Sequence, residues 1–467
     1  MTDPLPNIVL ILVDDLGWTD LSCYGSSFYE TPHLDALAAG GLRFTQAYAA
    51  APVCSPSRAA LLSGKYPARV GVTNWIGGHA VGTLADVPYF YGLPSSEYSL
   101  PRALRDAGYR TWHVGKWHLG EAQTSPEAHG FDVNIGGCAQ GSPSTYFSPY
   151  NISTLEDGPA GEYLTDRLTD EATALIADHD GRAPFFLNLW HYAVHTPIEA
   201  PDNLVDYYQT KADRLGLDTE PIEDGEPMPA WHLSGQHVRR RTQQSDPTYA
   251  AMVHTLDTSV GHIVETLQQS DQLDNTLIIF TSDNGGLSTA EGSPTCNLPL
   301  AQGKGWMEDG GVRVPLILAW PGRISPDDPD TLTTTPDLYP TVLAAAGIDP
   351  DPRQHLDGQD ILSVIEEAGG ERGPIFWHYP HYSNQGGTPG AAVRDGRWKL
   401  IRWFEDGREA LYDLHADIGE SVDLACARPD IRQRLAAALD AWMLDVRALI
   451  PQRNPLATPD AEASMTR

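Results

Sequence analysis

Apolar runs of similar length recur along the chain, and each one ends at polar residues. Residues 7–13 form an unbroken apolar run rich in β-branched side chains, and the runs at 276–281, 184–190 and 109–114 resemble it. Continuous runs of this kind are typical of strands that are buried on both faces of an α/β sheet. The pattern therefore predicts four core strands that lie far apart in the sequence.

Polar side chains that can bind ligands or transfer protons follow every one of these runs. They are Asp14 and Asp15 after the first, Asp283 and Asn284 after the second, His191 and His195 after the third, and Lys116 and His118 after the fourth. Because ligands bind beyond the carboxyl ends of the strands in open α/β sheets, we expect these side chains to meet at one edge. Lys116 and His118 project to the same side if their strand extends through them.

Helical patterns lie between the predicted strands, at residues 33–39, 99–107, 162–177 and 249–269. Alternation of strands and helices predicts an α/β fold with a large, mostly parallel mixed sheet that helices cover on both faces. We assign residues 1–369 to this domain. Residues 201–247 break the alternation with mixed charge and several prolines, so we predict an insertion over the mouth of the site that is partly ordered at best.

The C-terminal part of the chain has a different pattern. Short β-rich segments lie at residues 375–378, 391–394, 398–402 and 410–413, and two of the connections contain Asp-Gly, a strong hairpin signal. A helical pattern follows at 429–448. We therefore predict a small antiparallel sheet with a covering helix over residues 370–450, and a disordered tail over residues 451–467.

The chain is long and strongly acidic, with 467 residues, a hydrophobic share of 41% and a formal net charge of −31. This length predicts one large domain and one smaller domain. The charge argues against nucleic acid as a partner, and it also opposes a long sulfated polymer. A small anionic substrate that is drawn into a local cationic pocket is the class of partner that remains.

Cysteine usage and the N-terminal residues both favour a cytoplasmic protein. The five cysteines are widely spaced, so they predict neither a zinc knuckle nor a disulfide framework. Residues 1–6 lack a basic patch and an apolar leader, and the apolar run is too short to span a bilayer. We predict no export and no membrane partner.

Four oxygen-bearing side chains at two strand ends indicate a metal site. Asp14, Asp15, Asp283 and Asn284 supply three carboxylates and one amide oxygen, a donor set that suits calcium or magnesium better than zinc. Adjacent carboxylates are costly unless a cation neutralises them or one of them takes up a proton. The alternative for the Asp14–Asp15 pair is a role in capping a nearby helix.

Residues 54–58, Cys-Ser-Pro-Ser-Arg, form the start of a predicted helix that Gly64 can end. The N-terminus of a helix favours anions, and Arg58 can add a fork of donors for a tetrahedral oxyanion. Cys54 and Arg58 are closer in sequence than the corresponding pair of a cysteine phosphatase loop, which disfavours a thiolate nucleophile of that kind. The alternative is a buried cysteine before an ordinary helix.

Six motifs, in this order, resemble those of the type I, formylglycine-dependent sulfatases of the alkaline phosphatase superfamily. They lie at residues 13–17, 54–64, 115–120, 195–197, 282–285 and 303–305. The resemblance covers nearly the whole chain and implies an alkaline phosphatase-like fold and an arylsulfatase-type hydrolase of sulfate monoesters. A phosphonate monoester hydrolase or phosphodiesterase of the same superfamily, or a sulfate-ester binder without catalysis, is the alternative.

The resemblance also implies a modified cysteine and one divalent ion. A separate formylglycine-generating enzyme would oxidise Cys54 to formylglycine, and a hydroxyl of its hydrate would attack sulfur. Calcium, with magnesium as a possible substitute, would bind at Asp14, Asp15, Asp283, Asn284 and the modified Cys54.

Catalytic roles follow from the same resemblance, position by position. Arg58, Lys116 and Lys304 would offset charge on the sulfate oxygens. His195, together with Lys304, would protonate the leaving alcohol, and His118 would accept a proton from the second hydroxyl of the formylglycine hydrate.

The substrate expected from this resemblance is a sulfated sugar or a small aryl or alkyl sulfate. Aromatic and imidazole side chains near the pocket rim suit sugar stacking and hydroxyl bonding, and the candidates are Trp75, His79, His378 and His381. The alternative for the two C-terminal histidines is the buried edge of the small sheet. We expect packing or surface positions, not catalysis, for His113, His191, His254, His262 and Asp257.

Overall fold

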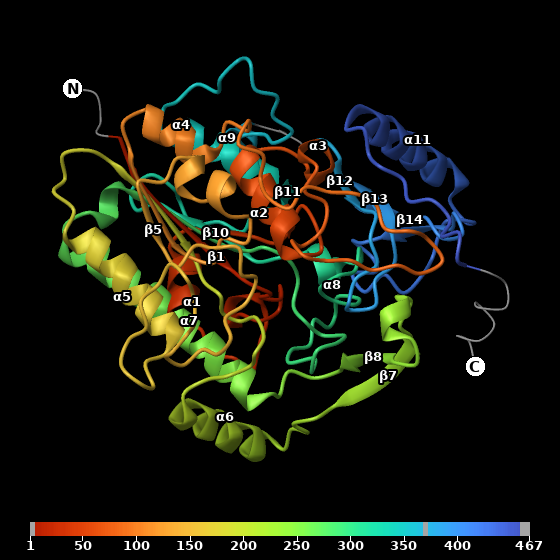
Figure 1. The fold of residues 1–467 in the computed structure, drawn as a ribbon, viewed down its shortest axis with the longest axis horizontal. Helices are drawn as coiled ribbons and strands as arrows, with labels where there is room; N and C mark the ends of the chain where they lie inside the picture. The colour runs from red at the N-terminus through yellow and green to blue at the C-terminus, as the bar shows by residue number, and fades with distance from the viewer. Residues whose placement is uncertain (1–4, 368–371, 458–467) are drawn as a thin grey trace.

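A sheet of seven strands crosses the centre of the protein, which we describe from a computed structural model for residues 5–367 and 372–457 (Figure 1). Its strand order is β2-β10-β9-β1-β6-β4-β5, and only β10 runs antiparallel to its neighbours in this described part. The bounds are β1 (Asn7–Val13), β2 (Leu42–Phe44), β4 (Arg110–Gly115), β5 (Val133–Ile135), β6 (Phe185–Trp190), β9 (Thr276–Ser282) and β10 (Leu316–Ala319). The predicted large, mostly parallel mixed sheet is confirmed.

The four strands predicted from the apolar runs are direct neighbours in this sheet. They lie in the order β9-β1-β6-β4 and pair in parallel, so that Val13 is opposite Ser282 and Leu12 is opposite Trp190. Trp190 is in turn opposite Gly115. The polar residues after all four strands therefore emerge at the same edge of the sheet, as expected from the sequence.

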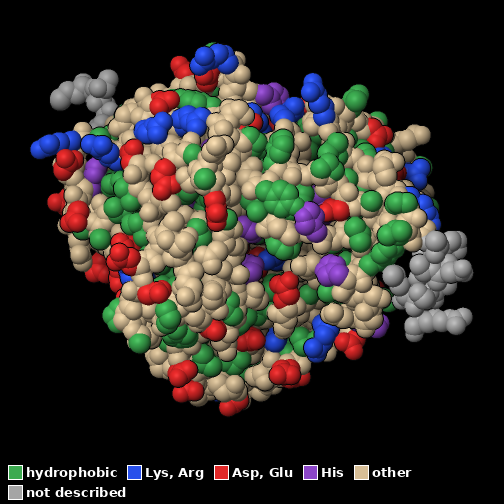
Figure 2. Space-filling model, viewed as in Figure 1, with side chains coloured by type: hydrophobic (Ala, Val, Ile, Leu, Met, Phe, Trp, Pro, Cys, Tyr) green, Lys and Arg blue, Asp and Glu red, His purple; other side chains and the backbone are tan. Residues whose placement is uncertain are grey.

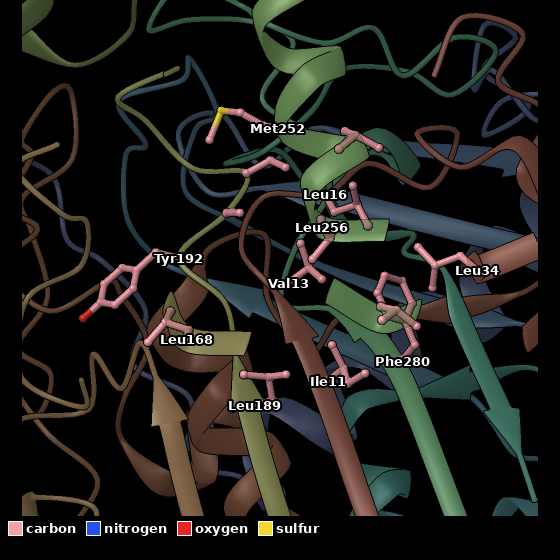
Figure 3. Packing of buried hydrophobic residues seen from close by; sticks show 14 of the residues in the cluster. Ile11, Val13, Leu16, Leu34, Leu168, Leu189, Tyr192, Met252, Leu256 and Phe280 are labelled. Carbon is pink, nitrogen blue, oxygen red and sulfur yellow. The ribbon is translucent and has the colours of Figure 1, made fainter. Parts of the chain in front are cut away.

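Helices cover both faces of the sheet (Figure 1). One layer contains α1 (Pro32–Ala39), α5 (Leu164–Ala177) and α7 (Pro247–Gln269), and the other contains α2 (Cys54–Ser63), α4 (Leu100–Asp106), α9 (Leu338–Ala345) and α10 (Ile361–Glu366). The side chains of β1 alternate between the two cores, which explains its unbroken apolar sequence. Figure 3 shows Ile11, Val13 and Phe280 on the side of the sheet that faces Leu256 of α7.

The insertion is more ordered than the sequence predicted. It contains α6 (Asp202–Leu215) and a hairpin of β7 (Ile222–Pro227) and β8 (His237–Arg241). α6 packs on α7 and buries Tyr208 and Ala212, and β8 buries Val238. The expectation of partial order is wrong because the insertion carries its own apolar face, which the mixed charge of the segment concealed.

A small antiparallel sheet with strand order β12-β13-β14-β15 forms the C-terminal part (Figure 1). The strands are β12 (Ile375–Tyr379), β13 (Gly390–Asp395), β14 (Trp398–Trp403) and β15 (Glu409–Asp413), and α11 (Pro429–Asp445) packs on them. The prediction of a small sheet with a covering helix is confirmed.

The predicted disordered tail is wrong for residues 451–457. Ala85 N donates to Gln452 O at 2.9 Å, and Asn454 N donates to Thr83 O at 2.9 Å. These bonds hold the segment against the loop at residues 82–85, because the segment supplies backbone partners that the loop would otherwise lack. Residues 458–467 lie outside the described part of the chain.

Short elements complete the described structure. They are β3 (Ala47–Tyr48), β11 (Thr333–Thr334), α3 (Pro67–Val70), α8 (Asp309–Val312) and the 3-10 helices η1 (Ser22–Tyr24), η2 (Ala122–Thr124), η3 (Glu127–His129), η4 (Trp231–Leu233), η5 (Leu273–Asn275) and η6 (Thr335–Asp337). None of the helices in residues 5–367 and 372–457 has the length and apolar character needed to cross a bilayer. The five cysteines all have free thiols.

Candidate active site

The carboxyl ends of β1 and β9 place Asp14, Asp15, Asp283 and Asn284 together, and all four are buried. The backbone joins the two ends, since Asp283 N donates to Val13 O at 3.1 Å. Asp15 adopts a left-handed conformation with φ of 62°, which turns the chain sharply at the end of the strand. The sequence prediction that these strand ends meet is confirmed by this arrangement.

Cys54 is the first residue of α2, and the whole of this helix is buried. Gly64 ends the helix in a left-handed conformation with φ of 67°, as predicted. The Cys54 Sγ lies 3.3 Å from His118 Nδ1, and Ser55 Oγ donates to His118 O at 2.9 Å. Burial raises the pKa of the Cys54 thiol, so an unmodified thiol at this position is a poor nucleophile.

Lys116 and His118 reach the site through a turn and not along an extended strand. β4 ends at Gly115, which has φ of 100°, and a Cβ at this position would lie 2.0 Å from Trp190 O. His118 itself has φ of 54°. The strand does not extend through both residues, which was the condition for their side chains to project to the same side, because the close approach of β6 forces the chain to turn at a glycine.

Arg58 and Lys116 lie against the carboxylates of Asp14 and Asp283. Arg58 Nη2 is 2.7 Å from Asp283 Oδ2 and 3.6 Å from Asp14 Oδ1, and Lys116 Nζ is 2.5 Å from Asp14 Oδ2. All of these side chains are fully buried. Burial raises the pKa of Asp14 to about 8, with Lys116 opposing this effect and Asp283 adding to it.

A second group forms around Asp15. Lys304 Nζ is 2.7 Å from Asp15 Oδ2 and 3.0 Å from His195 Nε2, and Asn284 Nδ2 donates to Asp15 Oδ1 at 2.8 Å. Burial opposes the ionisation of Asp15, but Lys304 and His195 hold its pKa at about 2. Burial and then Lys304 lower the pKa of His195 to about 3, so its imidazole is neutral.

Two oxygens in this group have no hydrogen-bond partner in the described part of the chain. They are Asp14 Oδ1 and Asn284 Oδ1, and both are buried. Ligand atoms of Asp14, Asp15 and His195 also lie within 4.8 Å of one another. Buried oxygens without donors are costly in an apolar interior, and a hard cation would satisfy them, so this donor set fits calcium or magnesium. The sequence placed His195 at the same edge as the carboxylates but did not count it among the possible metal ligands.

A profile of the sulfatase family matches residues 6–348. The chain belongs to the sulfatase family. It is a sulfuric ester hydrolase, and a profile of the C-terminal part of N-sulphoglucosamine sulphohydrolase matches residues 302–447.

Individual relatives are similar over most of their length. N-acetylgalactosamine-6-sulfatase of Rattus norvegicus is 35% identical over 425 residues, which cover 85% of this chain and 71% of that protein. Arylsulfatase A of Homo sapiens is 32% identical over 487 residues, which cover 92% of this chain and 86% of that protein. A sulfatase of Formosa agariphila is 31% identical over 525 aligned residues, with 94% of this chain and 89% of that protein covered.

Solved structures agree with this family assignment. The structure of Ps i-CgsB in complex with k-i-k-neocarrahexaose superposes with a TM-score of 0.76 and 28% identity, and covers 99% of this chain and 96% of that one. The phosphonate monoester hydrolase of Agrobacterium radiobacter has a TM-score of 0.63 and 22% identity, with 95% of each chain covered. At this identity the second likeness shows a shared fold alone.

Figure 2 shows several histidine side chains near the centre of the visible face, close to a Lys or Arg side chain. Of the predicted rim residues, His381 is buried, with Nδ1 at 2.7 Å from Asp86 Oδ1 and Nε2 at 2.9 Å from Thr73 Oγ1. His79 is exposed, and its Nδ1 is 3.0 Å from Asp86 Oδ2. Asp86 therefore links the two histidines, and no sequence motif had singled it out.

The other two candidate rim residues differ in position. Trp75 is half-buried and packs against the core beneath the small sheet. The next residue, Ile76, donates its backbone N–H to Ser55 Oγ at 3.1 Å. His378 is buried beside Phe404. It alternates along β12 with Trp377 and Tyr379, which face the large domain, so the structure does not bring His378 to the site.

The residues expected to have packing or surface positions lie outside the site. Asp257 accepts hydrogen bonds from the backbone of His33 and Leu34 at the start of α1. His113 contacts Asn188, and His191 contacts Ser259. His254 contacts Tyr208, and His262 is exposed on the surface.

Proposed function

We propose that this sulfatase cleaves the sulfate ester of a sulfated sugar, with a formylglycine made from Cys54 and one calcium ion as its reactive groups. The observation that carries the proposal is the position of Cys54 beside an unprotonated imidazole nitrogen, in a group with two buried oxygens that have no donor in the described part of the chain. Asp14, Asp15, Asp283 and Asn284 would hold the ion. When bound, these two groups supply a nucleophilic hydroxyl and a Lewis acid.

His118 is arranged to accept a proton from a group at position 54. Its Nε2 is 3.3 Å from Ile76 O, and a carbonyl only accepts, so Nε2 has the proton. Burial lowers the pKa of His118 well below its usual value, so the ring is neutral and has a single proton. Its Nδ1 therefore presents a lone pair to the side chain of residue 54 at 3.3 Å.

Lys304 and His195 form a proton path toward the leaving alcohol. His195 Nδ1 is 2.9 Å from Thr196 O, so this nitrogen has the proton of the neutral ring. Its Nε2 then accepts from the Lys304 ammonium at 3.0 Å. We infer that Lys304 is the source of the proton that the alkoxide requires, with His195 as the group that orients the Lys304 ammonium.

Three cations bind and orient the sulfate group. Arg58, Lys116 and Lys304 pair with Asp283, Asp14 and Asp15 respectively, and all three cations are buried. In a buried site, fixed positive charges stabilise charge on the sulfate oxygens more strongly than they would in water. The names of two similar proteins support a sugar as the alcohol part of the substrate. The cluster of His79, Asp86 and Tyr91 also supports it, since its polar groups suit sugar hydroxyls and Tyr91 OH contacts His79 Nε2.

Mass spectrometry of the peptide that contains Cys54, in active protein from its native host, tests the proposal. We expect the thiol to be replaced by an aldehyde, and an unmodified thiol in fully active protein would contradict it. Turnover of p-nitrophenyl sulfate should exceed that of a phenyl phosphonate monoester, and the reverse preference would favour a phosphonate hydrolase. A set of positionally sulfated sugars, with the neutral sugars as controls, then identifies the ester.

A further inference from the structure

A cavity of about 680 Å³ lies where the small sheet meets the edge of the large domain. Four arginines line it, together with Gln46 and Asp330, and they are Arg313, Arg372, Arg394 and Arg397. The volume lies within the range of small-molecule sites. Four guanidinium groups border this one cavity although the net charge of the chain is −31.

The cavity is separate from the active site. Arg394 is opposite Ile375 at one end of β12, whereas Tyr379 ends the strand on the active-site side, where its OH donates to Asn74 Oδ1 at 2.9 Å. Ile375 and Tyr379 are four residues apart, or about 13 Å along a strand. A ligand in the cavity would therefore not occupy the position of the sulfate ester under attack.

Two of the four arginines are neutralised by adjacent carboxylates. Arg372 Nη2 is 2.7 Å from Asp337 Oδ1, and Arg397 Nε is 2.6 Å from Asp413 Oδ1, each in a two-pronged arrangement. Arg313 Nη1 is farther from its carboxylate, at 3.5 Å from Asp309 Oδ2.

Arg394 differs from the other three. It is only 3% exposed, and among residues 5–367 and 372–457 no carboxylate oxygen lies within 4 Å of it. Its Nε donates to Gly396 O at 3.0 Å, and its two other nitrogens donate to Tyr48 OH and Gln46 Oε1. Its guanidinium therefore borders the cavity with hydrogen bonds to neutral oxygens alone.

A buried charge without a counter-charge is costly. Neutral side chains link Arg394 to two carboxylates: Tyr48 OH donates to Asp309 Oδ2 at 2.7 Å, and Gln46 Nε2 donates to Asp330 Oδ1. Asp309 already has Lys399 Nζ at 2.8 Å from its other oxygen. An anion in the cavity would supply the counter-charge that Arg394 lacks.

The cavity also has donors to spare. A guanidinium has five N–H groups, of which Arg394 uses three, and Arg397 uses its Nε and Nη2 on Asp413. The Nη1 of Arg397 remains for a ligand. Of the two carboxylates that line the cavity, Asp395 is paired with Arg434, and Asp330 Oδ1 accepts a hydrogen bond from Gln46 Nε2.

We propose that this cavity binds a tetrahedral oxyanion, sulfate or phosphate, either as a free ion or as the ester group of a sugar. Arg394 and Arg397 are its main donors, since planar forks of N–H groups match oxyanion geometry. The site does not depend on the mechanism proposed for Cys54. In a strongly acidic protein it would offer a sulfated ligand a second point of attachment.

Isothermal titration calorimetry with sodium sulfate at constant ionic strength tests the proposal. Full-length protein with Cys54→Ala in the background avoids heat from turnover when a sulfate ester is titrated. We expect two classes of sulfate site, one in the active site and one in the cavity. Adding Arg397→Gln should weaken the second class about tenfold or more, because a charge-assisted donor is lost.

Matched controls separate this effect from general changes in charge. Arg353 is exposed and has a two-pronged bond to Asp351, like Arg397 with Asp413, so Arg353→Gln should keep both classes of site. In protein with Cys54 intact, Arg397→Gln should leave kcat/KM for p-nitrophenyl sulfate unchanged. Arg394→Gln, with its melting temperature measured, should reproduce the loss.

Three further titrations distinguish the source of the oxyanion. Sodium phosphate and galactose 6-sulfate are compared with galactose, which should not bind the cavity. Loss of galactose 6-sulfate binding in the Arg397→Gln protein assigns the site to sulfated sugars, and loss confined to the inorganic ions assigns it to free oxyanions. A single class of sulfate site in the starting protein, or Arg397→Gln isotherms that superpose on it, would overturn the proposal.

Discussion

Replacing Glu420 with glutamine should remove a pH-dependent loss of stability at the joint between the two sheets. Lys399 Nζ lies 2.8 Å from both Asp309 Oδ1 and Glu420 Oε1, and all three side chains are fully buried. One ammonium therefore serves two carboxylates. Burial raises the pKa of Glu420 to about 8, whereas Lys399 and Arg313 overcome burial to hold that of Asp309 at about 2.

The sign and size of the effect follow from proton binding. Between pH 4.5, the ordinary pKa of a glutamate, and pH 8, folded Glu420 holds a proton that the unfolded chain has released. Stability therefore falls as pH rises through this window, by about 1.4 kcal/mol for each unit. From pH 5 to pH 8 the loss is about 4 kcal/mol. For a chain of this length, this corresponds to a shift of about 4 °C in melting temperature.

Differential scanning calorimetry at pH 5, 6, 7 and 8 measures this slope. Relative to the wild type, Glu420→Gln should gain stability steadily as the pH rises, because glutamine cannot ionise. Loss of the ion pair with Lys399 changes the stability of the variant by an amount that does not depend on pH. The slope of melting temperature against pH is therefore the quantity to compare. Glu265→Gln, at an exposed position on α7, is the control. Melting temperatures of the wild type and Glu420→Gln that run parallel over this range would refute the reasoning.

Three further predictions concern the catalytic site. Lys304→Met should lower kcat for the sulfated sugar about 100- to 1000-fold, because the proton source for the alkoxide leaving group is lost, and wild-type turnover would rule out that role. Chelation of calcium with EGTA should abolish turnover. Calcium at about 1000 times its Kd should restore turnover and stabilise the fold by about 4 kcal/mol. A melting temperature that does not change when calcium is added would count against the metal site. His79→Ala should lower kcat/KM for the sulfated sugar about five- to tenfold and leave that for p-nitrophenyl sulfate unchanged, whereas equal losses on both would place His79 outside the sugar subsite.

Much of the architecture could be predicted from local sequence patterns. The four apolar runs are strands because each is buried on both sides, as the alternation of β1 side chains between two cores demonstrates. The helix from Cys54 could be predicted from Pro56 and Gly64, which act within one or two turns. The insertion was harder to predict, since its order depends on Tyr208 and Val238, which become buried only when other segments pack over them.

The sequence by itself determined which chemical groups would stand at the ends of the strands and that the chain has the motifs of a sulfatase. The tertiary structure alone decided how these groups pair: Arg58 with Asp283, Lys304 with Asp15 and His195, and Asp86 with two histidines at the rim. Within the described part of the chain, it also left Asn284 Oδ1 without a donor and Arg394 without a directly paired carboxylate. Hydrophobic periodicity is set by neighbours a few residues away, whereas the partners of a buried charge are set by side chains far apart in the sequence that meet only once the sheets have packed.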